Sequence, residues 1–168
     1  ERELIVQAGK YFRRTRRPER ALELTQRFVD SRTTPATQAD AWILVAAHHL
    51  NQNNFTQVEK TLLQAADLAQ TFEITHSLGE FYLRKMDRPD LALPWYDQAA
   101  EFARQDKLPK LPMVLASRIA CALDRGVDDV DQARVYIEEY RRGFPDDPRA
   151  ALWESDLHVR VGRIDDAV

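Results

Sequence analysis

The stretch LGEFYLRKMDRPDLALPWYDQA, residues 78–99, holds the pattern that decides the fold. Its small residue Gly79 is followed by the large Tyr82 three residues later and, after a turn, by Ala92. The same order returns along the chain at Ala8-Gly9, Phe12 and Ala21, at Val45-Ala46, His49 and Val58, and at Ile119-Ala120, Leu123 and Ala133. The last marker falls at positions 21, 58, 92, 133 and 167, so the gaps are 37, 34, 41 and 34 residues. A period in the mid-thirties is typical of stacked helical hairpins.

Composition and breakers indicate an all-α chain. Helix formers dominate, only 5 of the 168 residues are Gly, and no strand-like run of Val, Ile and Thr occurs. Apolar spacing predicts a helix over 36–51, and turn residues at 51–54, 87–89 and 107–112 separate the later helices. We expect a single repeat domain over 1–168, built from hairpins at about 2–35, 36–71, 72–108 and 109–147 and a partial hairpin at 148–168.

These markers resemble the tetratricopeptide repeat (TPR) family. The third copy matches best, with Leu78-Gly79, Tyr82, Ala92, Tyr96 and Ala99, whereas His49 replaces the aromatic residue and Val58 the alanine in the second. The resemblance implies a right-handed superhelical solenoid of stacked antiparallel helix hairpins. It also implies that the first helix of each hairpin lines a concave groove, which takes a peptide or a helix of a partner.

The repeat register predicts which side chains line this groove. It is expected to be mixed, with a basic end and a partly apolar centre, and to be formed by Lys10, Arg13, Ile43, Ala47, Leu50, His76, Glu80, Leu83, Ser117 and Cys121. Such a surface suits an amphipathic or extended segment that carries some acidic residues. We therefore predict a protein-interaction scaffold with a protein or peptide partner.

No constellation in the sequence indicates catalysis, a metal or a cofactor. The neighbours His48 and His49 point about 100° apart on a helix, so they do not converge on one ion. The spacing of Asp124, Asp128, Asp129 and Asp131 does not place a Gly and a terminal Glu where a calcium loop requires them, and Asp128 or Asp129 is expected to cap a helix instead. Cys121 is expected to be a packed thiol. We predict that the chain is not an enzyme and needs no cofactor.

The charge distribution bears on partners. The net charge is −3, but residues 1–35 carry a net +4 and residues 124–168 a net −5. The run Arg13–Arg20 lacks the interleaved aromatic residues of nucleic-acid binders, so it is read as a solvated turn, with phosphate or an acidic peptide as the alternative. Nucleic acid is thus not favoured as a partner.

Other expectations concern the chain's context. No stretch reaches the roughly 18 apolar residues of a membrane span, no signal peptide is visible, and we expect a cytoplasmic protein. The first residue is Glu1 and the last lies within an expected helix, so we expect a fragment of a longer chain. Two alternatives to a binding scaffold stay open. One is a structural spacer that self-associates through the incomplete helix after Gly162, and the other is a substrate-recruiting arm of a larger enzyme.

Overall fold

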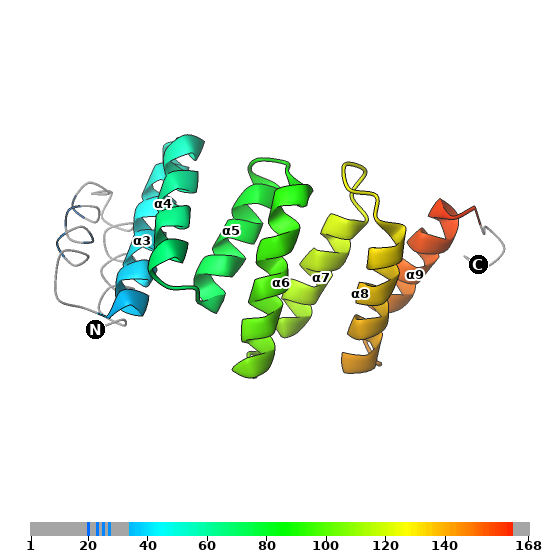
Figure 1. Cartoon of the computed structure of the whole chain (residues 1–168). Coiled ribbons are helices and arrows are strands. Elements are labelled where there is room, and N and C mark those ends of the chain that lie inside the picture. The colour runs from blue at the N-terminus through cyan, green and yellow to red at the C-terminus, as the bar shows by residue number, and fades with distance from the viewer. Residues whose placement is uncertain (1–19, 21–22, 24, 26, 28–33, 163–168) are drawn as a thin grey trace. The chain divides into compact units, whose positions relative to one another are not determined.

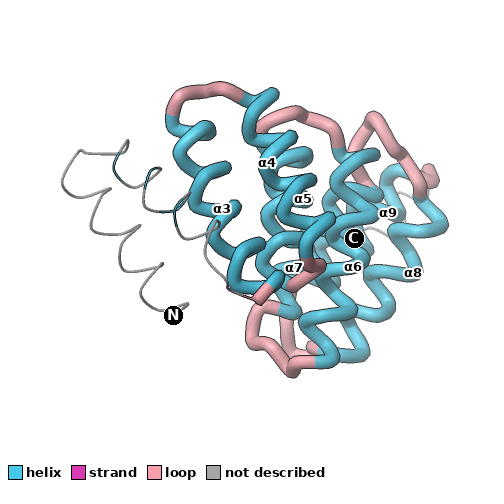
Figure 2. Tube along the Cα trace, turned by 60° about the vertical axis from the view of Figure 1, so that its left-hand side comes forward, coloured by secondary structure: helices cyan, strands magenta, loops and turns pink. Residues whose placement is uncertain are grey.

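The computed structural model describes residues 20, 23, 25, 27 and 34–162 (Figure 1). Every regular element within 34–162 is an α-helix, which confirms the all-α prediction for this part of the chain. The helices are α3 (Pro35–Asn51), α4 (Phe55–Leu68), α5 (Phe72–Arg84), α6 (Pro89–Gln105), α7 (Leu111–Ala122), α8 (Val130–Gly143) and α9 (Arg149–Arg160). Short connections join each helix to the next (Figure 2). The helix predicted over 36–51 is α3, which begins one residue earlier.

Local sequence explains where these helices begin. The side chain of Thr34 accepts a hydrogen bond from the backbone N–H of Thr37 at 3.3 Å, and Pro35 occupies the first turn of α3, where its missing N–H costs nothing. Asp129 caps α8 in the same way, because its Oδ1 accepts from the N–H of Gln132 at 2.9 Å. Of the two aspartates expected to cap this helix, Asp129 is therefore the one that does so.

The chain divides into two compact units, Glu1–Phe81 and Tyr82–Val168, which we describe separately. The ranges predicted for the hairpins and for a single domain stay predictions. In the first unit, α3 packs along α4 and buries Val45 and Ala46 on one side and Val58, Leu62 and Ala65 on the other. The ring of Phe55 at the start of α4 meets the edge of Phe81 in α5, with 6.3 Å between ring centroids. Because Ala46 is buried and carries only a methyl group, it allows the close helix approach that the repeat pattern predicts.

In the second unit α6 contacts α7, α7 contacts α8 and α8 contacts α9. Small side chains of α6 form much of this core, together with larger ones from α8. The fully buried members are Ala92, Tyr96, Ala99, Ala100 and Ala103 of α6, and Ala133 and Tyr140 of α8. Alanine at these positions lets the helices approach closely, and each tyrosine ring fills the space left between them.

The register predicted for α7 is wrong by one residue. The sequence pattern places the small contact residue at Ala120, but Ala120 is exposed, whereas Ile119 is fully buried. The buried positions 74, 75, 78, 79 and 82 of α5 recur in α7 at 114, 115, 118, 119 and 122, which is 40 residues later. The second helices are spaced by 41 residues, from Ala92 to Ala133. One residue of the 41-residue spacing therefore belongs to the connection between α7 and α8, and the rest of the extra length precedes α7.

A polar and aromatic cluster fixes the turn from α8 to α9. The hydroxyl of Tyr140 donates to Asp147 Oδ2 at 2.7 Å, and the same ring packs edge-on against Trp153, with centroids 5.0 Å apart. The guanidinium of Arg149 donates to both oxygens of Asp147, through Nε to Oδ1 at 3.0 Å and through Nη2 to Oδ2 at 2.6 Å. Burial, followed by the hydrogen bond to Asp147, raises the pKa of Tyr140 to about 12.

Among the helices that the structure describes, none combines the length and the apolar character needed to cross a membrane.

Candidate functional site

The residues predicted to line the groove on α3 lie along one side of that helix. Ile43, Ala47 and Leu50 follow one another at intervals of four and three residues, which places them on one helix face. All three are half-buried, while Val45 and Ala46 on the packed side are almost completely covered. This helix thus has a core face and a second apolar face that is partly open.

The predicted residues on α5 differ in character. The ring of His76 stacks on Phe72, with centroids 5.5 Å apart and an angle of 15° between the planes. Glu80 lies one turn further along the same side, and both side chains are half-buried. Leu83 is half-buried too and lies in the last turn of α5, which belongs to the second unit.

Other predicted positions contribute little accessible surface. Ser117 is only 8% exposed, and its hydroxyl donates to the carbonyl of Met113 at 3.2 Å. Cys121 is fully buried, in agreement with a packed thiol. Lys10, Arg13 and the rest of the basic run up to Arg17 lie outside the described residues, as do the residues after Gly162. The groove as a whole stays a prediction.

Sequence reasoning missed the most strongly connected charged group in residues 34–162, which is centred on Arg118. This guanidinium donates through Nε to Asp97 of α6 at 2.7 Å and through Nη1 to Glu139 of α8 at 2.9 Å. It also lies over the ring of Tyr136, 3.9 Å from the centroid. Arg104 of α6 pairs with the second oxygen of Glu139. We call these five residues the Arg118 cluster.

The electrostatics of the Arg118 cluster favour the charged guanidinium. Only 10% of the Arg118 side chain is exposed, and burial alone would lower its pKa. The nearby carboxylates of Asp97 and Glu139 outweigh burial, so the pKa of Arg118 is raised overall. Burial, and then the charge of Asp97, raises the pKa of Tyr136, whose hydroxyl donates to Asp97 at 3.2 Å. Every polar group at the centre of this cluster has a partner, so the arrangement joins three helices and presents no activated nucleophile or base.

A sequence signal for Arg118 does exist. Residues 111–123 read LPMVLASRIACAL, an apolar stretch interrupted by one charge. A charged residue on a helix that is apolar nearly all round is expected to be buried and paired. With the corrected register, Arg118 occupies the position that Leu78 holds in α5.

The remaining titratable groups do not form a metal site in the part of the chain that is described. No group of three or more His, Cys, Asp or Glu side chains is arranged there to hold an ion. His48 and His49 stand edge to face, with ring centroids 5.7 Å apart. Burial, and then the neighbouring His48, lowers the pKa of His49. The absence of a metal or a cofactor in the functional protein stays a prediction.

Comparison with known proteins supports the architecture. Sequence comparison matches the chain to no family model and to no curated protein. Comparison with solved structures does find matches, and one of them is described as a TPR protein. The chain therefore has an all-α, TPR-like helical-repeat fold, and the resemblance seen in the repeat markers is confirmed at the level of fold.

Three solved structures illustrate this likeness. PilW, described as a widely conserved type IV pilus biogenesis factor, is 17% identical with a TM-score of 0.66, and the match covers 99% of this chain and 72% of that one. YrrB, described as a TPR protein with an unusual peptide-binding site, is 16% identical with a TM-score of 0.70, and 95% and 77% of the two chains are covered. PilF of Pseudomonas aeruginosa is 17% identical with a TM-score of 0.70, and 99% and 71% are covered.

Proposed function

We propose that this chain is a non-enzymatic interaction scaffold that binds a peptide or a helix of a partner protein along its first helices. The observation that carries the proposal is the partly open apolar face of α3, formed by Ile43, Ala47 and Leu50. An apolar face with i, i+4 and i+7 spacing is suited to an amphipathic helix or to the apolar side chains of an extended segment.

Two further features support this function. His76 and Glu80 on α5 add polar groups that would set the orientation and register of a bound segment, since polar contacts contribute specificity more than affinity. The TPR-like fold is a second support, because one of the solved neighbours is described as having a peptide-binding site. A peptide held by this chain would pair its own acidic side chains with Lys10 and Arg13 at the basic end predicted from the sequence.

The experiment is a selection of random peptides displayed on phage against the purified chain. Affinities of the selected peptides are then measured for the wild type, Ile43→Asp and Leu68→Asp. Leu68 is an exposed apolar residue of α4, so Leu68→Asp introduces the same charge outside the predicted groove. We expect Ile43→Asp to weaken binding at least about tenfold, because it places a charge against an apolar ligand surface, and Leu68→Asp to leave it unchanged.

Circular dichroism separates lost binding from lost folding in these variants. Helicity should be the same in all three proteins, since neither substituted residue is fully buried. If selected peptides bind Ile43→Asp and a second groove variant, Leu83→Asp, as well as they bind the wild type, the assignment of the groove is wrong.

A further inference from the structure

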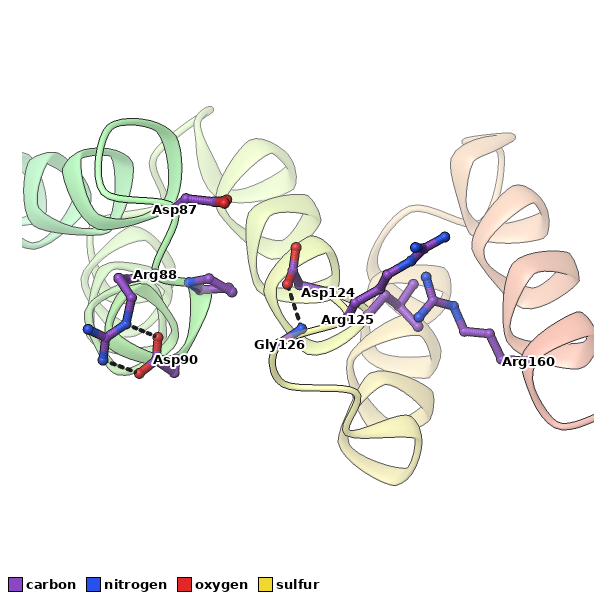
Figure 3. A pocket seen from close by; sticks show the side chains of 9 residues that line it. Asp87, Arg88, Asp90, Asp124, Arg125, Gly126 and Arg160 are labelled. Atoms are coloured by element: carbon purple, nitrogen blue, oxygen red, sulfur yellow. Dashed lines mark hydrogen bonds and ion pairs between the residues drawn. The ribbon is translucent and has the colours of Figure 1, made fainter.

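A polar cleft in the second unit is lined by turns and helix ends (Figure 3). It encloses about 690 Å³ between the turn that leads into α6, the turn after α7 and the end of α9. Three aspartates and three arginines line it, namely Asp87, Asp90, Asp124, Arg88, Arg125 and Arg160. Pro89, Leu123 and Gly126 complete the lining. Because these charges cancel, the cleft has no net attraction for a polyanion such as a nucleic acid.

Some of these charges are already paired within the cleft wall. Arg88 donates to both oxygens of Asp90, at 2.8 and 2.6 Å, and this pairing lowers the pKa of Asp90. Arg160 donates from Nε to Asp156 at 3.0 Å and from Nη1 to Asp128 at 3.4 Å. These side chains are held in place, so they form the fixed part of the cleft.

The remaining charges have no ionic partner within residues 34–162. Arg125 and Asp87 make no ion pair there, and Asp124 uses one oxygen to accept the N–H of Gly126 at 2.8 Å. Figure 3 shows that the two groups are separated, with Asp87 and Asp124 toward one end and the guanidinium groups of Arg125 and Arg160 at the other. Both arginines also line an adjoining hollow of about 400 Å³ together with Asp128 and Asp156, the two carboxylates that pair with Arg160. The cleft is therefore polarised by Asp87 and Asp124 at one end and by Arg125 at the other.

We propose that this cleft is a second interaction site, which binds a peptide segment of a partner protein carrying one basic and one acidic side chain. The basic side chain would lie against Asp87 and Asp124, and the acidic one against Arg125, since Arg160 is already paired with Asp128 and Asp156. A guanidinium binds a carboxylate through two parallel hydrogen bonds, which a solvated ion does not replace equally well. This site is separate from the proposed groove on the first helices, so each can fail without the other.

The test uses glycine–serine peptides, acetylated and amidated, that carry one Lys and one Glu at increasing separations in both orders. Binding is followed through the backbone amide signals of Arg125 and Gly126 in nuclear magnetic resonance spectra at low salt. We expect at least one separation to shift these signals, and about 0.15 M salt to weaken the effect because exposed charges are screened. Arg125→Gln and Asp87→Asn should each weaken binding about threefold.

Matched controls make the result decisive. Arg134→Gln removes an exposed arginine of the same unit that does not line the cleft, and it should bind like the wild type. Peptides with Gln in place of Glu should bind as weakly to the wild type as the parent peptide binds to Arg125→Gln. The proposal is overturned if no Lys–Glu peptide shifts the signals, if Arg125→Gln changes nothing, or if inorganic phosphate alone produces the same shifts.

Discussion

Helices α5 and α7 share one pattern of burial but satisfy it with different chemistry. At equivalent positions α5 buries Leu78, which is fully covered, and α7 buries Arg118, which is 8% exposed. Leu78 gains stability by leaving water, and it needs only neighbours of the right shape. Arg118 loses its hydration, and the contacts with Asp97, Glu139 and the face of Tyr136 compensate for this loss. The comparison teaches that a repeat position prescribes burial, while the neighbouring helices decide which residue can occupy it.

The largest effect is expected from removing the apolar member of this pair. Leu78→Ala should lower the free energy of unfolding by about 3 kcal/mol, because it removes buried methyl groups and leaves a cavity. Urea denaturation measures the change. Leu152→Ala is the control, since Leu152 is 69% exposed and should cost less than about 0.5 kcal/mol. Equal costs for the two variants would contradict the burial assigned to α5.

Removing the charged member should have a somewhat smaller effect. Arg118→Ala should cost about 2 kcal/mol, because Asp97 and Glu139 lose their shared partner but keep some contact with water. Arg118→Leu, which copies α5, should cost clearly less than Arg118→Ala, since leucine refills the space. Denaturation in urea at low and high salt distinguishes the variants. If leucine is no better than alanine, position 118 is not equivalent to position 78.

The corrected register of α7 predicts changes in the free energy of unfolding that are about as large as that of Arg118→Ala or smaller. Ala122 is fully buried and Ala120 is exposed, although only two residues separate them. Ala122→Leu should cost about 1–2 kcal/mol through overpacking, and Ala120→Leu should be nearly neutral. Thermal unfolding followed by circular dichroism provides the comparison. The opposite order would restore the register that the sequence markers suggested.

The smallest change concerns the turn after α8. Tyr140→Phe should cost about 1 kcal/mol near pH 7, since the hydroxyl loses its hydrogen bond to Asp147. The pKa of Tyr140 is raised to about 12 in the folded protein, against roughly 10 in an unfolded chain. Its contribution is therefore complete below about pH 10 and is lost as the pH rises toward 12.

Absorbance of the tyrosinate ion measures this titration directly. The wild type should contain one tyrosine that ionises near pH 12, and Tyr140→Phe should lack it. The difference in stability between the two proteins should shrink over the same pH range. A wild-type protein in which every tyrosine ionises near its ordinary pKa would contradict the bond to Asp147.

Much of the fold could be predicted because helical periodicity is a strong local signal. The spacing of apolar residues placed α3 within one residue of its observed start. The register of α7 could not be placed in this way, because Ile119 and Ala120 are neighbours and both suit a helix. Only the packing against α6 and α8 selects which of them turns inward.

The candidate site was predictable to a smaller extent. The face formed by Ile43, Ala47 and Leu50 follows from spacing on one helix, and all three residues are half-buried, while their role in binding stays a prediction. In the Arg118 cluster, Asp97 precedes Arg118 by 21 positions and Glu139 follows it by 21. Local sequence patterns therefore could not reveal these partners. The polarised cleft likewise depends on turns that are distant in sequence.

The Arg118 cluster also has a consequence for local opening of the second unit. The guanidinium of Arg118 forms hydrogen bonds with a carboxylate of α6 and with one of α8. Breaking either contact therefore leaves this charge of α7 with fewer partners in a site with little water. Opening of any one of the three helices therefore weakens the hold on the other two. Their backbone amides should exchange with solvent deuterium as one cooperative block, more slowly than those of α9.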